Sequence, residues 1–173
     1  MLMLSLLIWS LIIGTQSATL ASQLEMEANA IFNSGWWDSV AYSNLSNHCY
    51  WYGIICNKAG SITKIQIYET TLVIPEIQFA TLKLSVFHNL ESLVLISNEL
   101  QGNIHKEIGL LSKLTHLDLS NNALRGAIPP SLRNLTKLMY LDISNNLLQG
   151  FIPHELGFMK NLTTLDLSYN RIK

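Results

Sequence analysis

A repeat of 24 residues runs through the second half of this 173-residue chain. Leucine returns at that step, and an asparagine follows each of these leucines by five residues. A unit of this size cannot bury an apolar face on its own, so units that recur in register must stack and share one core. The recurring positions are Leu93, Leu117, Leu141 and Leu165; Asn98, Asn122, Asn146 and Asn170; Gly102, Gly126 and Gly150; and Ile104, Ile128 and Ile152.

Each unit contains a short stretch in which apolar and polar residues alternate. In Leu117-Asp118-Leu119 the two leucines point inward and Asp118 points outward, which predicts a strand. The asparagine amides can bond to backbone groups that the following bend leaves without sheet partners, and glycine permits the tight return. A period in the twenties with this pattern is typical of a leucine-rich-repeat solenoid. We therefore predict an α/β fold, a curved right-handed coil with a parallel sheet on its concave face.

The amino-terminal segment is the most hydrophobic part of the chain. Its apolar run extends from Leu2 to Ile13 and is followed by Gly14 and several small residues. This length suits a signal peptide and falls short of the ~20 residues that span a bilayer. We predict a signal peptide over residues 1–21; a buried core helix is the alternative, because no Lys or Arg precedes the run.

Residues 22–61 are predicted to form an amino-terminal cap. Residues 21–34 have the spacing of an amphipathic helix that Ser22 would start and Gly35 would stop. Its predicted apolar face consists of Leu24, Ala28, Ile31 and Phe32, with Glu25 and Glu27 pointing elsewhere. An aromatic cluster, favoured as a plug for one end of the core over a ligand site, consists of Trp36, Trp37, Tyr50, Trp51 and Tyr52.

Two cysteines, Cys49 and Cys56, lie in the cap. After a signal peptide the oxidising compartment favours a disulfide between them, and closing so small a loop contributes about 2.5 kcal/mol. A zinc site is the alternative, but it would need two more ligands at suitable spacing, and His48 alone does not provide them.

Two turns carry a resemblance to a known family. Residues 122–129 read Asn-Ala-Leu-Arg-Gly-Ala-Ile-Pro, and residues 146–153 repeat the Asn-x-Leu-x-Gly-x-Ile-Pro pattern. This motif resembles plant-specific leucine-rich repeats, and the helix, tryptophan pair and cysteine pair before it resemble the cap of plant leucine-rich-repeat receptor-like kinases. The chain then divides into the signal peptide, the cap and repeats over residues 62–173, of which one is irregular, three are full and one is partial.

Three departures from the motif stand out. His105 occupies the position of Pro129 and Pro153, so we expect the first regular turn to be less stiff. The unit that begins at Ile62 is four residues longer than the period, and Thr70 stands where an asparagine is expected. We interpret this unit as a transition between the cap and the array.

Outward-facing strand positions predict columns across the sheet, and these form the candidate ligand face. The acidic column is interpreted as framework in preference to a contact for a cationic ligand, because Leu-Asp-Leu-Ser is common in such repeats. Its carboxylates, although spaced like a glycosidase pair, would sit on an open face with no means to raise a pKa. The predicted face consists of Lys64, Gln66, Tyr68, Val94, Ile96, His116, Asp118, Tyr140, Asp142, Thr164 and Asp166.

The remaining patterns restrict the function. The net charge of −1 lacks the excess of positive charge that is typical of proteins that bind nucleic acid. The histidines fit no metalloprotease pattern, and no phosphate-binding loop or kinase motif occurs in the sequence. We therefore predict no enzyme, no cofactor and no metal. Glycosylation acceptors in a secreted chain are Asn44, Asn134 and Asn161.

The resemblance implies a non-catalytic recognition module that begins the extracellular part of a receptor kinase. Its expected partners are a peptide or protein ligand and a co-receptor, with a membrane attachment only through a downstream segment. Five strands offer a concave face on the order of 250 Å², against about 800 Å² on each side of a stable protein interface. Together with an array that stops inside a unit, this predicts a piece of a longer protein in the secretory pathway, at the apoplast or the outer plasma-membrane face. The alternative is a free secreted binder, such as an inhibitor of microbial cell-wall-degrading enzymes.

Overall fold

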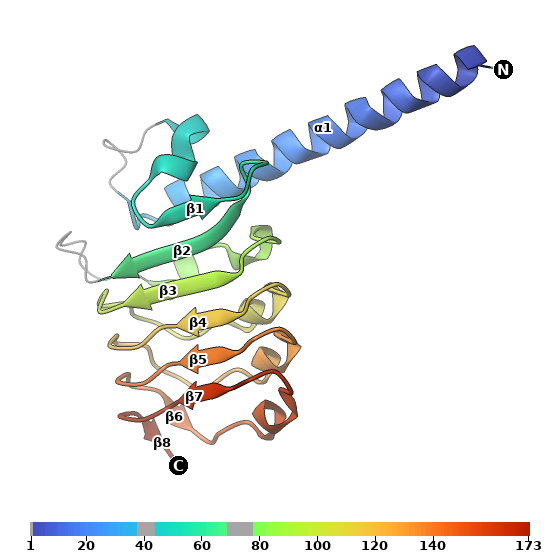
Figure 1. Cartoon of the computed structure of the whole chain (residues 1–173). Coiled ribbons are helices and arrows are strands. Elements are labelled where there is room, and N and C mark those ends of the chain that lie inside the picture. The colour runs from blue at the N-terminus through green and yellow to red at the C-terminus, as the bar shows by residue number, and fades with distance from the viewer. Residues whose placement is uncertain (1, 38–43, 69–77) are drawn as a thin grey trace.

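The computed structural model describes residues 2–37, 44–68 and 78–173, with side chains described from residue 16 onward (Figure 1). A long helix leads into a small cap, and a column of coils follows beneath it. Each coil carries a strand on one side and a short helix on the other. Thr70, where an asparagine was expected, lies outside the described residues.

The strands of successive coils form one six-stranded sheet in the order β1-β2-β3-β4-β5-β7. From β2 to β7 every pair is parallel, which confirms the predicted solenoid. The cap contributes β1, which pairs antiparallel with β2 and was not predicted. The bounds are β1 Ile54–Cys56, β2 Ile62–Tyr68, β3 Ser92–Ile96, β4 His116–Asp118, β5 Tyr140–Asp142 and β7 Thr164–Asp166, with β6 Gln149–Gly150 and β8 Arg171–Ile172 in a separate parallel pair.

Short 3₁₀ helices return the chain on the side opposite the sheet. Pro129 and Pro153 precede two of them with φ of −73° and −59°. His105 precedes the equivalent helix with φ of −71°, so it adopts the backbone angle that proline would impose. The helices are η1 Leu45–Tyr50, η2 Phe79–Thr81, η3 Leu84–Val86, η4 Lys106–Leu110, η5 Pro130–Asn134 and η6 His154–Phe158.

The core is a stack of the inward-facing residues. Leu93, Leu117 and Leu141 are each 0% exposed, because every one of them lies between two coils. Leu165 holds the same position in the last coil and is 46% exposed. The burial of a leucine in this fold therefore depends on the coil that follows it.

A ladder of asparagines joins neighbouring coils at the turn after each strand. The Oδ1 atom of Asn122 accepts the backbone N–H groups of Asn98 and Leu100, both at 3.0 Å. Its Nδ2 atom donates to the carbonyls of Leu95 in the preceding coil and Leu119 in its own. Asn146 and Asn170 each accept one N–H from the preceding coil and donate to carbonyls of both the preceding coil and their own, so these amides satisfy backbone groups that the bend removes from the sheet.

A residue with positive φ precedes each ladder asparagine, and the sequence did not reveal this requirement. Asparagine tolerates the left-handed conformation better than most residues do, which suits Asn121 and Asn145. Tyr169 adopts it at φ of 52° in the last coil. The four equivalent residues are Ser97, Asn121, Asn145 and Tyr169.

The helix α1 extends from Leu2 to Phe32 without a break. The predicted start at Ser22 is therefore wrong, because Gly14 does not end the preceding helical segment. Figure 1 shows the amino-terminal part of α1 projecting away from the array, while its last turns pack on the cap. Ala28 and Ile31 are buried there. Among the residues whose side chains are described, no helix has the length and apolar character to cross a membrane. A signal peptide over residues 1–21 stays a prediction.

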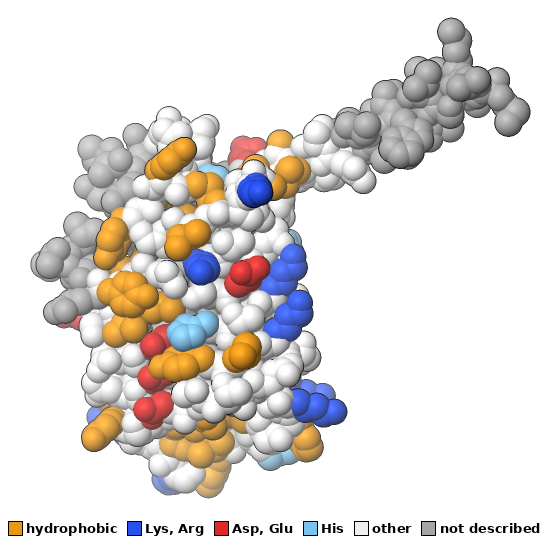
Figure 2. Space-filling view, in the orientation of Figure 1, with side chains coloured by type: hydrophobic (Ala, Val, Ile, Leu, Met, Phe, Trp, Pro, Cys, Tyr) orange, Lys and Arg blue, Asp and Glu red, His pale blue; other side chains and the backbone are white. Residues whose placement is uncertain are grey.

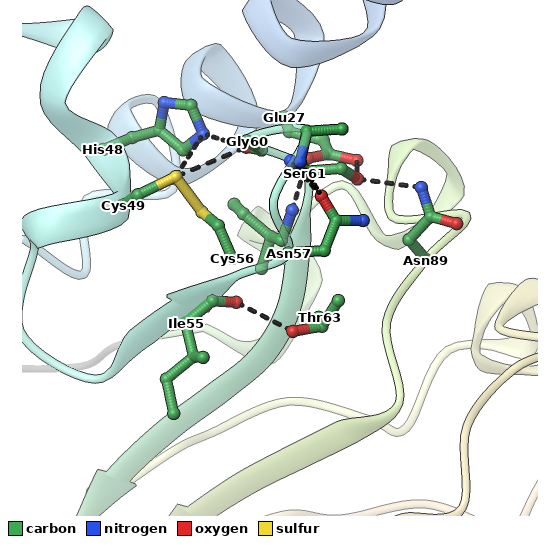
Figure 3. The surroundings of a disulfide bond; sticks show 12 residues. Glu27, His48, Cys49, Ile55, Cys56, Asn57, Gly60, Ser61, Thr63 and Asn89 are labelled. Atoms are coloured by element: carbon green, nitrogen blue, oxygen red, sulfur yellow. Dashed lines mark hydrogen bonds between the residues drawn. A yellow bond between two sulfur atoms is a disulfide. The ribbon is translucent and has the colours of Figure 1, made fainter.

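Glu27 departs from the expected pattern because it is buried instead of pointing away from the core, at 0% exposure. Its Oε1 atom accepts the hydroxyl of Ser61 at 2.8 Å, and its Oε2 atom accepts the N–H of Ile62 at 2.8 Å. Figure 3 shows Glu27 beside Ser61, which also accepts a bond from Asn89. Glu27 thus connects α1 to the start of β2, and its hydrogen bonds offset the cost of burying a carboxylate.

The Cys49–Cys56 disulfide is present next to this junction (Figure 3). The ring nitrogens of His48 lie 2.9 Å from the carbonyl of Leu45 and 3.1 Å from that of Gly60. The zinc alternative is wrong, because two bonded sulfurs cannot act as thiolate ligands.

The predicted aromatic plug is correct for the tryptophans only. Trp36, Trp37 and Trp51 are buried in the core, and the indole N–H of Trp37 donates to the carbonyl of Tyr52 at 3.0 Å. The side chains of Tyr50 and Tyr52 are exposed. A tryptophan ring can be buried in the core when its single polar atom has a hydrogen-bond partner nearby.

Candidate ligand-binding face

The outward side chains of β2, β3, β4, β5 and β7 form one continuous surface, which we call the sheet face. The strand register places the predicted ligand residues in rows across it. The first row is Lys64, Ser92, His116, Tyr140 and Thr164; the second is Gln66, Val94, Asp118, Asp142 and Asp166; Tyr68 and Ile96 pair in a third.

A hollow of about 500 Å³ lies on the sheet face over β2, β3 and β4. Eight of its lining residues come from these rows, and Glu91 and Thr115 complete it. Glu91 and Thr115 were not predicted, although both stand immediately before a strand and are 24 residues apart. This spacing, which equals the repeat period, is the sequence signal that could have identified them. The row residues that line the hollow are Lys64, Gln66, Tyr68, Ser92, Val94, Ile96, His116 and Asp118.

The residues of the sheet face differ in how much surface they offer. Val94 and Asp118 are only 3% and 6% exposed, so they contribute little contact area. Tyr68 is 51% exposed, and Ile96 beside it is half-buried. The Tyr68–Ile96 pair therefore forms an apolar and accessible part of the hollow.

A column of acidic side chains runs down the sheet face over β4, β5 and β7 (Figure 2). One oxygen of each carboxylate accepts the backbone N–H two residues later, at 2.9 to 3.0 Å. Hydrogen bonds from the side chain and then from the backbone N–H of Ser168 hold the pKa of Asp166 below its ordinary value. Each aspartate thus has a framework role in its own turn. The three pairs are Asp118 with Ser120, Asp142 with Ser144 and Asp166 with Ser168.

An aromatic pair lies beside the acidic column. The rings of His116 and Tyr140 stack with centroids 4.2 Å apart and an interplanar angle of 8°. The Tyr140 hydroxyl donates to Oδ2 of Asp142 at 3.2 Å. Partial desolvation, followed by the charges of Asp142 and Asp118, holds the pKa of Tyr140 above its ordinary value of 10.0. The pair fixes the position of one carboxylate and presents a flat aromatic edge to the face.

The three glycosylation acceptors lie outside the sheet face. Asn44 precedes η1, Asn134 ends η5, and Asn161 lies between η6 and β7; all three are exposed. The Nδ2 atom of Asn161 donates to the carbonyl of Thr136 at 2.7 Å. Glycans at these sites stay a prediction, and they would leave the sheet face open.

Comparisons with known proteins agree with this geometry. Residues 112–172 match the family described as leucine-rich repeat. A comparison with curated proteins found no match. Among solved structures, the BIR3–SERK2 complex from Arabidopsis thaliana is similar with a TM-score of 0.65 and 32% identity, over 72% of this chain and 66% of that chain.

Two further structures illustrate the range of proteins with this fold. The plant peptide hormone receptor RGFR1 in complex with RGF2 has a TM-score of 0.62 and 38% identity, over 72% of this chain and 18% of that chain. A plant ice-binding protein has a TM-score of 0.66 and 27% identity, over 89% of this chain and 48% of that chain. The chain thus spans between 18% and 66% of the length of these three structures.

The repeat family and the structural neighbours define the chain as a leucine-rich-repeat solenoid with the fold of plant receptor ectodomains. That fold is a non-catalytic framework. Because an ice-binding protein shares it, the function has to be argued from the side chains of the sheet face and not from the fold.

Proposed function

We propose that this chain is a non-catalytic extracellular recognition module that binds a peptide or protein ligand on its sheet face. The observation that carries the proposal is the hollow over β2, β3 and β4. Framework positions repeat from coil to coil, whereas the first row changes from Lys64 to His116 to Tyr140. A surface whose side chains vary on a constant framework suits the recognition of one specific partner.

The size of the sheet face favours an extended peptide. The five parallel strands span roughly 19 Å, at ~4.8 Å for each interval between strands. An extended chain covers that width with about six residues. A globular partner would need several times this area for a stable interface, and would have to use other surfaces as well. RGFR1, a structural neighbour, is a peptide hormone receptor.

We further propose that the module begins the ectodomain of a plant receptor-like kinase that signals with a co-receptor. The support is the similarity to receptor ectodomains, together with the fraction of their length that the chain spans. Extracellular placement follows from the same proposal. Sequencing the full transcript through the Lys173 codon tests it. An open frame that continues into repeats, a membrane span and a kinase is the expected result, and an immediate stop codon would contradict it.

Ligand binding can be tested with a phage library of random linear dodecapeptides, selected on the chain expressed through a secretory host. We expect the enriched peptides to lose affinity when Ile96→Arg fills the hollow. Leu110→Arg is the matched control, because Leu110 is exposed on η4, on the other side of the coil. If both variants bind every enriched peptide like the parent chain, the sheet face is not the binding site.

A further inference from the structure

The sheet face changes character from the cap toward the last coil. On β2 and β3 the carboxyl ends are apolar, with Tyr68 paired with Ile96, whereas Lys64 begins the outward row of β2. The far side carries the acidic column of Asp118, Asp142 and Asp166 on β4, β5 and β7. A peptide that crosses the strands from the Tyr68–Ile96 pair therefore meets an apolar surface first and a negative surface next.

The acidic column has no basic partner among the described residues of the chain. Within residues 16–37, 44–68 and 78–173, the ion pairs are His105–Glu107 and His154–Glu155, and neither involves the column. Asp142 accepts one bond from Ser144 and one from Tyr140. An ionised carboxylate has about four acceptor positions, so Asp142 retains capacity for a donor from a ligand.

The spacing of the column does not favour a metal ion. In the described part of the chain, the side chains close enough to share an ion are His48, Cys49 and Cys56, and those sulfurs form the disulfide. The three carboxylates do not form such a group. A cation carried on a long, flexible side chain can instead contact one carboxylate at a time. His116 covers one face of the Tyr140 ring and the ring edge does not attract a cation, so the carboxylate of Asp142 provides the attraction for a lysine or arginine side chain.

We propose that the ligand is an extended peptide with an aliphatic residue and a basic residue two positions apart. The aliphatic side chain packs on Ile96 and Tyr68, and the basic side chain binds Asp142 next to Tyr140. This inference rests on the proposed function and specifies the class of peptide.

The dimensions agree with this arrangement. Residues two apart in an extended chain point to the same side and lie roughly 7 Å from each other. Ile96 on β3 and Asp142 on β5 are separated by two strand intervals and, because Asp142 shares the row of Val94, by two residues along the strand, or roughly 12 Å in all. The length of a lysine or arginine side chain covers the difference. Lys64, on β2 at the opposite end of the hollow, disfavours the reverse placement by repelling a basic residue there.

The test uses the peptides that the dodecapeptide selection enriches. We expect an aliphatic and a basic residue two positions apart in those peptides, and about tenfold weaker binding to Asp142→Asn, since a hydrogen bond to a charged group is lost. The new amide oxygen can still accept from Ser144, and its NH₂ group can donate to the Tyr140 oxygen, so the coil keeps its shape. Glu107→Gln is the matched control, because it removes one carboxylate from the exposed helix η4.

The outcomes separate this inference from the proposed function. Weaker binding to Asp142→Asn, together with parental binding to Glu107→Gln and weakening by added salt, supports the aliphatic-and-basic peptide. Binding that is lost with Ile96→Arg but unaffected by Asp142→Asn overturns the inference and leaves peptide recognition in place. Peptides that bind all variants equally, or a selection that enriches none, overturn both.

Discussion

The two ends of the leucine-rich array meet solvent in different ways. At the amino end, β1 covers one edge of the sheet, and the last turns of α1 bury Ile31 against the core. Glu27 and the Cys49–Cys56 disulfide hold that cover in place. At the carboxyl end, β7 has a sheet partner on one side only among the described residues.

The carboxyl-terminal coil shows the consequence. Leu117 is 0% exposed and Leu165 is 46% exposed; Ile128 is 1% exposed and Ile152 is 51% exposed. Figure 2 shows hydrophobic side chains gathered at this end of the molecule. Equivalent residues in equivalent conformations thus differ because one has a coil on both sides and the other does not. The residues of each coil cover the core residues of the coil next to it.

The largest expected difference between the two regions comes from truncating equivalent leucines. Leu117→Ala should lower the free energy of unfolding by about 3 kcal/mol, and Leu165→Ala by about 1 kcal/mol, because only the first creates an enclosed cavity. Urea denaturation of both variants measures the difference. Equal losses would mean that the two coils are buried to the same degree in solution.

The disulfide tests how much the amino-terminal cover depends on its covalent link. Replacing both cysteines by serine should cost about 2.5 kcal/mol, the chain-entropy contribution of a loop this small. Denaturation of the wild type with and without reductant provides the control. A variant as stable as the oxidised parent would show that packing by α1 and Glu27 suffices.

A smaller effect is expected where the first regular turn lacks its proline. His105 already adopts the φ angle of Pro129. The substitution His105→Pro should therefore raise the free energy of unfolding by roughly 0.5–1 kcal/mol, because proline lowers the conformational entropy of the unfolded chain. Pro129→Ala is the matched reverse change and should lower stability by a similar amount. A destabilised His105→Pro variant would indicate that the backbone at His105 needs its N–H group or more freedom.

The smallest effect concerns Asp166 at the open end. Its pKa is lowered by hydrogen bonds from Ser168, so the carboxylate contributes stability above the ordinary value of 3.8 and loses it as the pH falls through the lower folded value. The stability of the Asp166→Asn variant should therefore fall less than that of the parent as the pH drops below 3.8. Thermal melts across that range measure it, and identical acid dependence would show that these bonds do not persist in solution.

The repeat itself was predictable because its information is local. Leu117 and Asn122 recur with their neighbours at a constant step, and that step determines which side chains face inward and which share a row. The disulfide was equally predictable, since two nearby cysteines after a predicted signal peptide favour this bond. Every residue of the predicted ligand face lies on one surface for the same reason: parallel strands in register preserve the period.

The properties that contacts from distant segments create were not predictable. Glu27 has the helical position of a surface residue, yet Ser61 and Ile62 approach from another part of the chain and bury it. The stack of His116 on Tyr140 needs two strands 24 residues apart to lie side by side. Ser22 has the features of a helix cap, but α1 continues through it.

The sequence by itself determined the period, the strand and turn of each coil, the asparagine ladder positions and the rows of outward residues, because these depend on patterns within one unit. Only the tertiary structure decided which of those residues are accessible, how the cap attaches and where the hollow lies. Burial and charge at each position depend on the neighbouring coil. The sequence of a single unit does not show whether that neighbour is a cap, another repeat or solvent.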